Sequence, residues 1–150
     1  MHAVREQGLP MKSEAILLKD RAKALAHYPH ARRVGNLLFF SGCSSRRPDN
    51  THEGVILHPS GVIEKDIRAQ TRAVLENMRV ILQAAGGDLD DLVDITTFLV
   101  DMKDFAGYNE VYNQYFDAET GPARTTVAVR ELPHPNLLIE MKGVAALRER

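Results

Sequence analysis

The chain has 150 residues, a hydrophobic content of 44%, a charged content of 26% and a formal net charge of −1. These values predict one globular domain with its own core, and the near-neutral charge argues against nucleic acid as the main partner. The single cysteine, Cys43, excludes a disulfide within the chain. With no apolar run long enough to span a bilayer and no signal-peptide core, the sequence predicts a cytoplasmic protein without membrane contact.

The first half of the chain gives few regular patterns. Residues 1–12 show no periodicity and are predicted to be a flexible extension before a single domain at residues 13–150. Residues 13–26 fit a strand, a helical turn or an irregular arm equally well. Residues 34–41 predict a hairpin that turns at a Gly-Asn pair. The following segment, 43–61, is predicted to be irregular, with turns at its Pro-rich and Gly-rich points.

Two helices are predicted in the second half. Apolar residues recur at three- and four-residue steps over residues 66–85, which predicts a helix that ends at the glycine pair after it. Residues 88–91 are predicted to form a capped turn, and residues 92–100 a strand, because β-branched residues alternate there. Asp101 is expected to cap a second helix. The residues that this helix is expected to bury are Phe105, Tyr108, Val111, Tyr112, Tyr115 and Phe116.

Residues 121–140 carry the charges on which the functional interpretation depends. An extended segment places Arg124 and Thr126 on one face, and the next strand, which ends near residue 146, places Glu140 among apolar neighbours. A charge in such surroundings needs a partner or has a shifted pKa. One interpretation is a structural salt bridge between Arg124 and Glu140. The other is a pocket in which Arg124 binds a carboxylate and Glu140 transfers protons.

This order of elements predicts an α+β fold, with two helices on one face of a mixed sheet. Alternating apolar residues predict that the other face is covered, and self-association into a closed ring covers it most simply. No Gly-rich phosphate loop, cysteine pair or histidine spacing predicts a nucleotide or metal site. Cys43 is interpreted as a small residue near a pocket, with a nucleophile as the alternative. Arg46 and Arg47 fit a solvated loop pair, with carboxylate binding as the alternative.

Several separated motifs resemble the RidA/YjgF imine deaminase family over about residues 25–147. In chain order they are Tyr28 ahead of RVGNLLFFSG at 33–42, QTRAVLEN at 70–77, TFLVDM at 97–102 leading to Asn109, PARTTV at 122–127, and Glu140. The resemblance implies a chorismate-mutase-like fold, a homotrimer with clefts between subunits, and hydrolysis of imines and enamines without a cofactor. It also implies that Tyr28, Asn109, Arg124 and Glu140 share one cleft.

Three stretches, 28–30, 44–51 and 132–140, resemble a branch of this family that acts on 2-aminomuconate in aromatic catabolism. That branch implies conversion of this six-carbon dicarboxylate to 2-oxohex-3-enedioate and ammonia, in the breakdown of 2-aminophenol or of tryptophan through 3-hydroxyanthranilate. Arg124 then binds the carboxylate beside the reacting carbon, Glu140 deprotonates water, and Thr126 and Cys43 line the site. The candidates for binding the second carboxylate are His30, Arg46 and Arg47. A dimer of trimers is an alternative to a single trimer, and no residue is assigned to that contact.

Other functions fit the same residues. A general deaminase of 2-imino acids needs the same Arg124 and Glu140, whereas a non-catalytic trimer that binds keto acids needs only Arg124. Ribonuclease activity, known for some members of the family, is disfavoured because the chain lacks a basic, aromatic-rich strip.

Overall fold

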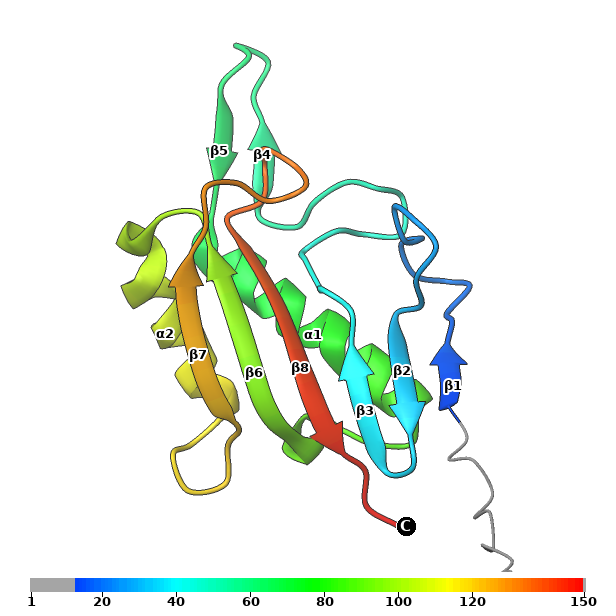
Figure 1. The fold of residues 1–150 in the computed structure, drawn as a ribbon. Coiled ribbons are helices and arrows are strands. Elements are labelled where there is room, and N and C mark those ends of the chain that lie inside the picture. Colours follow the sequence, from blue (N-terminus) through cyan, green and yellow to red (C-terminus); the bar gives the residue numbers. More distant parts are fainter. Residues whose placement is uncertain (1–12, 150) are drawn as a thin grey trace, which may run out of the picture.

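The computed structural model describes residues 13–149 and confirms the predicted α+β architecture. Within these residues a six-stranded sheet has the order β1-β2-β3-β8-β6-β7, and a separate two-stranded sheet pairs β4 with β5. Figure 1 shows both helices on one face of the larger sheet. The predicted extension at residues 1–12 lies outside the described residues. The strands are β1 (Ser13–Ile16), β2 (Ala31–Val34), β3 (Leu37–Phe40), β4 (Val55–Leu57), β5 (Ile63–Lys65), β6 (Leu92–Leu99), β7 (Ala123–Ala128) and β8 (Ile139–Ala146). The helices are α1 (Ile67–Ala84) and α2 (Phe105–Tyr115), and the 3₁₀ turns are η1 (Leu89–Asp91) and η2 (Met102–Asp104).

The last strand of the chain lies in the middle of the sheet. β8 pairs antiparallel with both β3 and β6, and β6 pairs parallel with β7. β7 and β8, which are joined by residues 129–138, are therefore not neighbours in the sheet, although they follow each other in sequence. β6 separates them, so β7 forms the edge of the sheet.

Helix α1 supplies the centre of the hydrophobic core, and the prediction of a helix over 66–85 is confirmed. Its first turn is capped by the Asp66 carboxylate, which accepts hydrogen bonds from the backbone N–H groups of Arg68 and Ala69. Gly86, with φ of 87°, ends it as predicted. The face that α1 buries carries Val74, Leu75, Met78, Ile81 and Leu82, all within the main core cluster.

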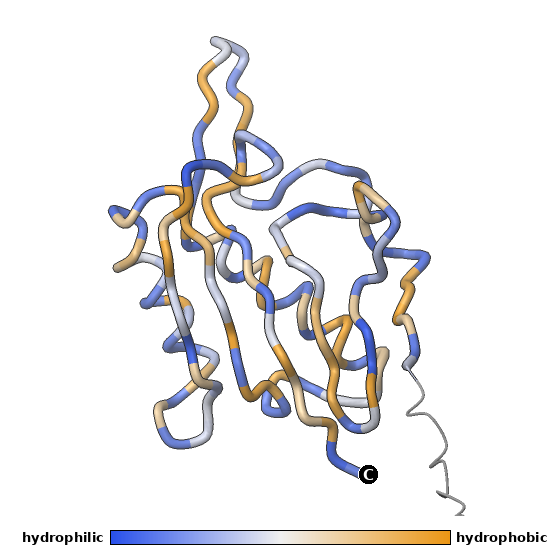
Figure 2. The backbone as a smooth tube through the Cα atoms, viewed as in Figure 1, coloured by the Kyte–Doolittle hydropathy of each residue, from blue (hydrophilic) through white to orange (hydrophobic). Residues whose placement is uncertain are grey.

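The β4–β5 hairpin corrects the prediction that residues 43–61 are irregular throughout. Each of its strands has only three residues, and most of their side chains are exposed, so no alternation of buried and exposed positions marks them in the sequence. The predicted turn at residues 59–61 is present and joins the two strands, with Gly61 at φ 86°. Figure 2 shows hydrophobic residues along this projecting hairpin, and Leu57 and Val62 are 69% and 60% exposed.

The start of the second helix also differs from the prediction. Asp101 caps η2, where it accepts from the Lys103 N–H at 2.8 Å, and α2 begins only after this 3₁₀ turn. Of the side chains predicted to be buried by this helix, Tyr108, Val111 and Tyr112 are buried. Phe105 is 40% exposed, and Tyr115 and Phe116 are half-buried. The exposed Phe105 ring lies beside Arg124 of β7.

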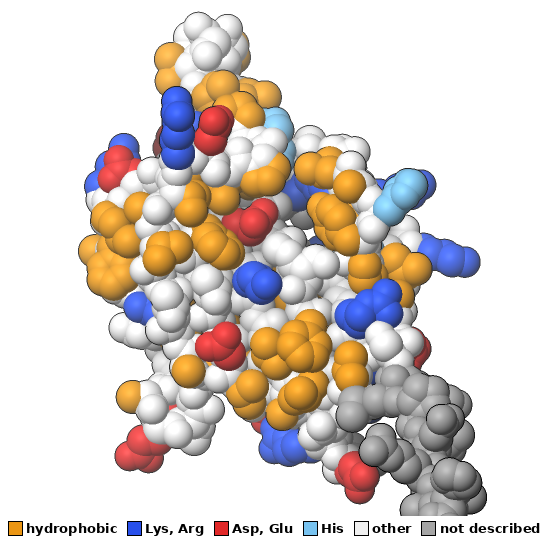
Figure 3. Space-filling model, in the orientation of Figure 1, with side chains coloured by type: hydrophobic (Ala, Val, Ile, Leu, Met, Phe, Trp, Pro, Cys, Tyr) orange, Lys and Arg blue, Asp and Glu red, His pale blue; other side chains and the backbone are white. Residues whose placement is uncertain are grey.

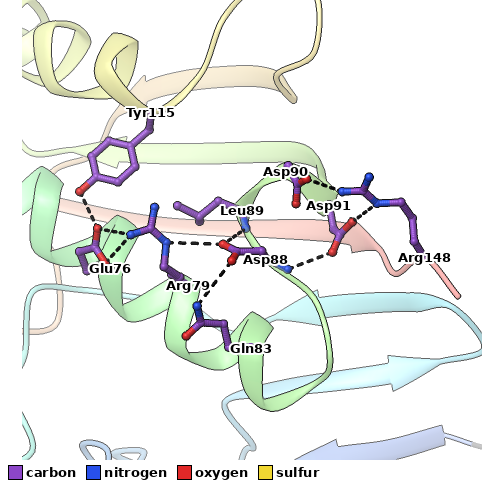
Figure 4. Close-up of polar contacts among 9 residues, drawn as sticks. All are labelled: Glu76, Arg79, Gln83, Asp88, Leu89, Asp90, Asp91, Tyr115 and Arg148. Carbon is purple, nitrogen blue, oxygen red and sulfur yellow. Dashed lines mark hydrogen bonds and ion pairs between the residues drawn. The ribbon is translucent and has the colours of Figure 1, made fainter. Parts of the chain in front are cut away.

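Charged side chains join the end of α1 to α2 and to the segment after β8 (Figure 4). Asp88 and Asp91 form a reciprocal capping box around η1, which confirms the predicted capped turn at 88–91. Arg148, after β8, binds Asp91 at 2.7 Å. The Tyr115 hydroxyl donates to Glu76 of α1 at 2.8 Å. These contacts fix both helices relative to the end of the sheet.

The segment that leads into β8 is held by a buried amide. Gln70 of α1 is 0% exposed. Its Nε2 donates to the Asn136 carbonyl, and its Oε1 accepts from the Leu138 N–H, each at 2.9 Å. Both groups of the amide are therefore used to fix the path of residues 136–138.

Replacing Gln70 with leucine is expected to lower the free energy of unfolding by about 1–3 kcal/mol, because two backbone groups lose their partner. Urea denaturation measures this change. Gln114→Leu, at an exposed position of α2, is the matched control and should leave the free energy nearly unchanged. Equal stability of the two variants would contradict a structural role for the Gln70 amide.

Candidate active site

Arg124 and Glu140 lie on opposite faces of the sheet in a single chain. In the strand register Arg124 is opposite Ile95, which is buried beneath the helices, so Arg124 points to the α2 side. Glu140 is opposite Phe98 of β6. Phe98 is three residues from Ile95 and therefore points to the opposite face of the sheet, which no helix covers and which is called the open face. Glu140 points to this open face. This arrangement excludes the structural salt bridge within one chain. It also separates the predicted site residues into two groups.

The first group surrounds Arg124. Its guanidinium carbon lies 4.7 Å from the ring centroid of Tyr108, 4.6 Å from that of Tyr112 and 5.8 Å from that of Phe105. Such stacking holds a guanidinium without using its N–H donors. Among the described residues Arg124 makes no hydrogen bond or ion pair. Its donors are therefore available to an anion.

Thr126 belongs to the same group, and Asn109 lies on the helix that carries its aromatic residues. The Thr126 hydroxyl lies 3.2 Å from the Tyr108 hydroxyl, which confirms that Thr126 and Arg124 face the same way. Asn109 is on α2, and its helical spacing places it between Phe105 and Tyr112 on the helix surface. Arg124 and Thr126 line an open groove of about 480 Å³. This groove offers a cation, but no side chain that transfers protons near neutral pH.

The second group surrounds Glu140, which lines a cleft of about 560 Å³ on the other side of the sheet. Tyr28, from the loop before β2, and Arg46, from the loop after β3, line the same cleft. Burial raises the pKa of the half-buried Glu140 carboxyl above that of an ordinary glutamate. A raised pKa is typical of a carboxylate that exchanges protons near neutral pH.

Cys43 is buried and lines a small pocket of about 80 Å³ that shares Tyr28, Gly42 and Arg46 with the Glu140 cleft. Its backbone pairs with that of Met141, next to Glu140. Burial, and to a smaller extent the neighbouring Glu140, raise the pKa of the thiol to about 12. The thiol is therefore protonated at neutral pH and is a poor nucleophile. This supports the interpretation of Cys43 as a small residue beside the pocket.

His30 holds the N-terminal arm. Its Nδ1 accepts from the Leu18 N–H at 3.2 Å, so its Nε2 carries the proton and donates to the Ala22 carbonyl at 2.9 Å. Both ring nitrogens are engaged with backbone groups, and His30 does not line the Glu140 cleft.

Of the two neighbouring arginines, only Arg46 lines the Glu140 cleft, and its guanidinium donates to the Lys23 carbonyl. Arg47 pairs with Glu53 at 2.8 Å and donates to Thr51 at 3.1 Å within its own loop. Its side chain stabilises that loop and is absent from the lining of the Glu140 cleft.

Two histidines that the sequence interpretation does not select also line the Glu140 cleft. His52 comes from the loop after β3 and His134 from the segment before β8, and their ring centroids are 4.3 Å apart. His134 lies in one of the stretches that resemble the 2-aminomuconate branch, which is a signal that could have found it. His52 has no such signal, because only the folded loops bring the two rings together.

Gly42 contacts the Glu140 carboxylate closely. A Cβ at position 42 would lie 2.7 Å from Glu140 Oε2 and 2.9 Å from its carboxyl carbon. Gly42 is exposed and does not have a positive φ, so the approach of the carboxylate, rather than backbone conformation, requires glycine here.

Gly42→Ala is expected to displace the Glu140 carboxylate and so to slow any reaction that uses this group about 10–100-fold, with an unchanged melting temperature. The comparison is made in the wild-type and Glu140→Asp backgrounds, because the shorter aspartate leaves room for the methyl group. Gly42→Ala should slow the reaction less in the Glu140→Asp background than in the wild type, which would show that positions 42 and 140 are energetically coupled. The same loss in both backgrounds would show that Gly42 acts elsewhere.

Within residues 13–149 no group of three or more His, Cys, Asp or Glu side chains is arranged to hold a metal ion. Neither helix in this part of the chain combines the length and hydropathy needed to cross a bilayer.

A family model described as Endoribonuclease L-PSP matches residues 18–147. The chain belongs to this family, known also as RidA/YjgF. A RutC family protein of Pyrococcus abyssi is 38% identical over 135 residues, which cover 90% of this chain and 98% of that protein. Reactive Intermediate Deaminase A, chloroplastic, of Arabidopsis thaliana is 35% identical over 137 residues, covering 91% of this chain and 67% of that protein. The crystal structure of E. coli TdcF with bound serine has a TM-score of 0.73 at 31% identity and covers 90% of this chain and 99% of that one.

Proposed function

We propose that this RidA/YjgF protein is a hydrolytic deaminase of enamine and imine acids, with 2-aminomuconate as its substrate. The observation that carries the proposal is the half-buried Glu140, with its raised pKa, in a cleft of a size typical for small ligands. A binding protein for keto acids needs a cation but has no use for a buried proton acceptor. The name of the Arabidopsis relative, a reactive intermediate deaminase, supports the same chemistry.

The reaction needs one cation and one proton carrier. The Arg124 guanidinium binds the carboxylate beside the reacting carbon and fixes its position. The enamine tautomerises to the imine, and Glu140 removes a proton from water as the water oxygen bonds to the imine carbon. Glu140 returns this proton to the nitrogen, which gives a neutral carbinolamine. Glu140 then takes the proton of the carbinolamine hydroxyl and passes it to the nitrogen as the C–N bond breaks, so that the nitrogen leaves as ammonia with both protons of the water. The water oxygen becomes the keto oxygen of 2-oxohex-3-enedioate.

The two groups of site residues meet only if a second copy of the chain supplies one of them. Arg124 of one protomer then faces Glu140 of its neighbour. Exposed apolar side chains on the open face support self-association, since Phe39 is 44% and Val127 is 40% exposed. Figure 3 shows hydrophobic side chains on this face over β3 and the adjacent part of β8, and again near the end of β7. Because each chain supplies Arg124 to one neighbour and Glu140 to the other, three chains form a closed ring, a homotrimer with three such sites.

Ammonia release from a panel of substrates tests the proposal. The panel contains freshly generated 2-aminomuconate and 2-iminopropionate, a smaller monocarboxylate. Release above the spontaneous rate from 2-aminomuconate, with a higher kcat/KM than for 2-iminopropionate, is expected. Preference for 2-iminopropionate would establish the general 2-imino acid deaminase instead. No enhancement with either substrate would leave a keto-acid-binding protein.

A further inference from the structure

His52 and His134 form a stacked pair in the wall of the Glu140 cleft. The two rings are tilted by 39° and belong to different loops. Their loops are held independently of each other. Arg47 donates to the His52 carbonyl at 3.3 Å, and buried Gln70 fixes the segment after His134. The pair is therefore presented by two supported loops rather than by one flexible segment.

The hydrogen bonds of the two rings leave three of their four ring nitrogens without a partner among the described residues. His134 Nδ1 accepts from the Asn136 N–H at 3.1 Å, so in the neutral ring the proton is on Nε2. This Nε2–H has no acceptor among the described residues. Neither ring nitrogen of His52 has a partner in this part of the chain, although only 9% of the residue is exposed. Such groups favour a ligand that accepts hydrogen bonds.

The charges around the pair favour an anion. Glu140 is the only carboxylate among the described residues that line the cleft, whereas Lys23 and Arg46 line it as cations. The pKa of His52 is lowered by burial, and further by His134, Arg46 and Arg47. Burial alone accounts for the raised pKa of Glu140, with no cation lowering it. The cleft thus carries two cations beside the histidine pair and one carboxyl whose pKa is raised by burial.

We infer that His52 and His134, together with Arg46, bind the second carboxylate of a dicarboxylic substrate or product. This inference rests on the proposed function and names the residues that select its substrate class. The first carboxylate binds Arg124, the reacting carbon lies at Glu140, and the far carboxylate accepts hydrogen bonds from the histidine pair and Arg46. Acids with an apolar tail leave these donors unpaired and bind more weakly.

Calorimetric titration of the Glu140→Gln protein tests the inference without turnover. The two ligands are 2-oxoadipate, a six-carbon keto dicarboxylate, and 2-oxohexanoate, its monocarboxylate counterpart. The variants are His52→Phe and His134→Phe, which keep a ring and remove the donors, and His134→Gln, which keeps an N–H near the position of Nε2. His58→Phe, on the exposed β4–β5 hairpin, is the matched control.

We expect His134→Phe and His52→Phe each to weaken 2-oxoadipate binding about tenfold or more, with 2-oxohexanoate binding changed less than about twofold. His134→Gln should bind 2-oxoadipate more tightly than His134→Phe, and His58→Phe should match the parent. Equal losses for both ligands, or no loss for either, would overturn the inference. Selective binding by the histidines without ammonia release in the panel assay would instead retain the inference and overturn the proposed function.

Discussion

Glu140→Gln is expected to reduce kcat for ammonia release by about 10²–10⁴-fold, because the amide cannot accept a proton from water. The substitution preserves the shape of the side chain. Ionised Glu140 is disfavoured by burial, as its raised pKa indicates, so the variant should be at least as stable as the wild type at neutral pH. Rates are measured by coupled ammonia detection and stability by thermal unfolding. Glu131→Gln, at an exposed position, is the control.

The pH dependence gives a second readout for Glu140. The carboxylate must be ionised to act as a base, so kcat/KM falls as pH decreases through its pKa. Because burial raises that pKa, this acidic limb should lie above the range of an ordinary glutamate. The residual activity of Glu140→Gln should lack the limb. A wild-type rate that stays constant down to the pKa of a solvent-exposed glutamate would assign the base to another group.

Arg124→Ala is expected to reduce kcat/KM about 10²–10³-fold, because the substrate loses the bidentate contact that fixes its carboxylate. Arg130→Ala, at an exposed arginine beyond the end of β7, should retain wild-type activity. The aromatic rings around Arg124 pack against one another, so the fold should tolerate the substitution.

Mixing the two inactive variants distinguishes a site within one chain from a site between chains. When Arg124→Ala and Glu140→Gln chains assemble together in equal amounts, about a quarter of interfacial sites combine an intact arginine with an intact glutamate. Activity should return to that fraction of the wild-type value. A mixture as inactive as its components, with mixed oligomers confirmed by mass spectrometry, would rule out a shared site.

The sequence predicts the central helices and strands well because their signals are local. The apolar spacing of α1, the capped turn at η1 and the alternation of β6 each follow from neighbouring residues. The β4–β5 hairpin is missed because its apolar residues cover no core. The position of β8 between β3 and β6 is also missed, since strand order depends on long-range pairing that no local pattern encodes.

The candidate site is predicted in part for the same reason. Alternation along β7 and β8 correctly places Arg124 with Thr126 and sets Glu140 apart from its apolar neighbours. It does not show that Arg124 and Glu140 face opposite ways, because that relation depends on the register of each strand against β6. The histidine pair is formed by loops about eighty residues apart, and only folding creates their contact.

The central place of β8 has a consequence for biosynthesis. Because residues 139–146 join β3 to β6, the sheet stays divided until these residues have left the ribosome. Until then both flanking strands present unpaired backbone groups to other nascent chains. A premature stop before residue 139 would therefore leave β3 and β6 each with an unpaired edge. Such truncated products should aggregate rather than persist as a smaller folded protein.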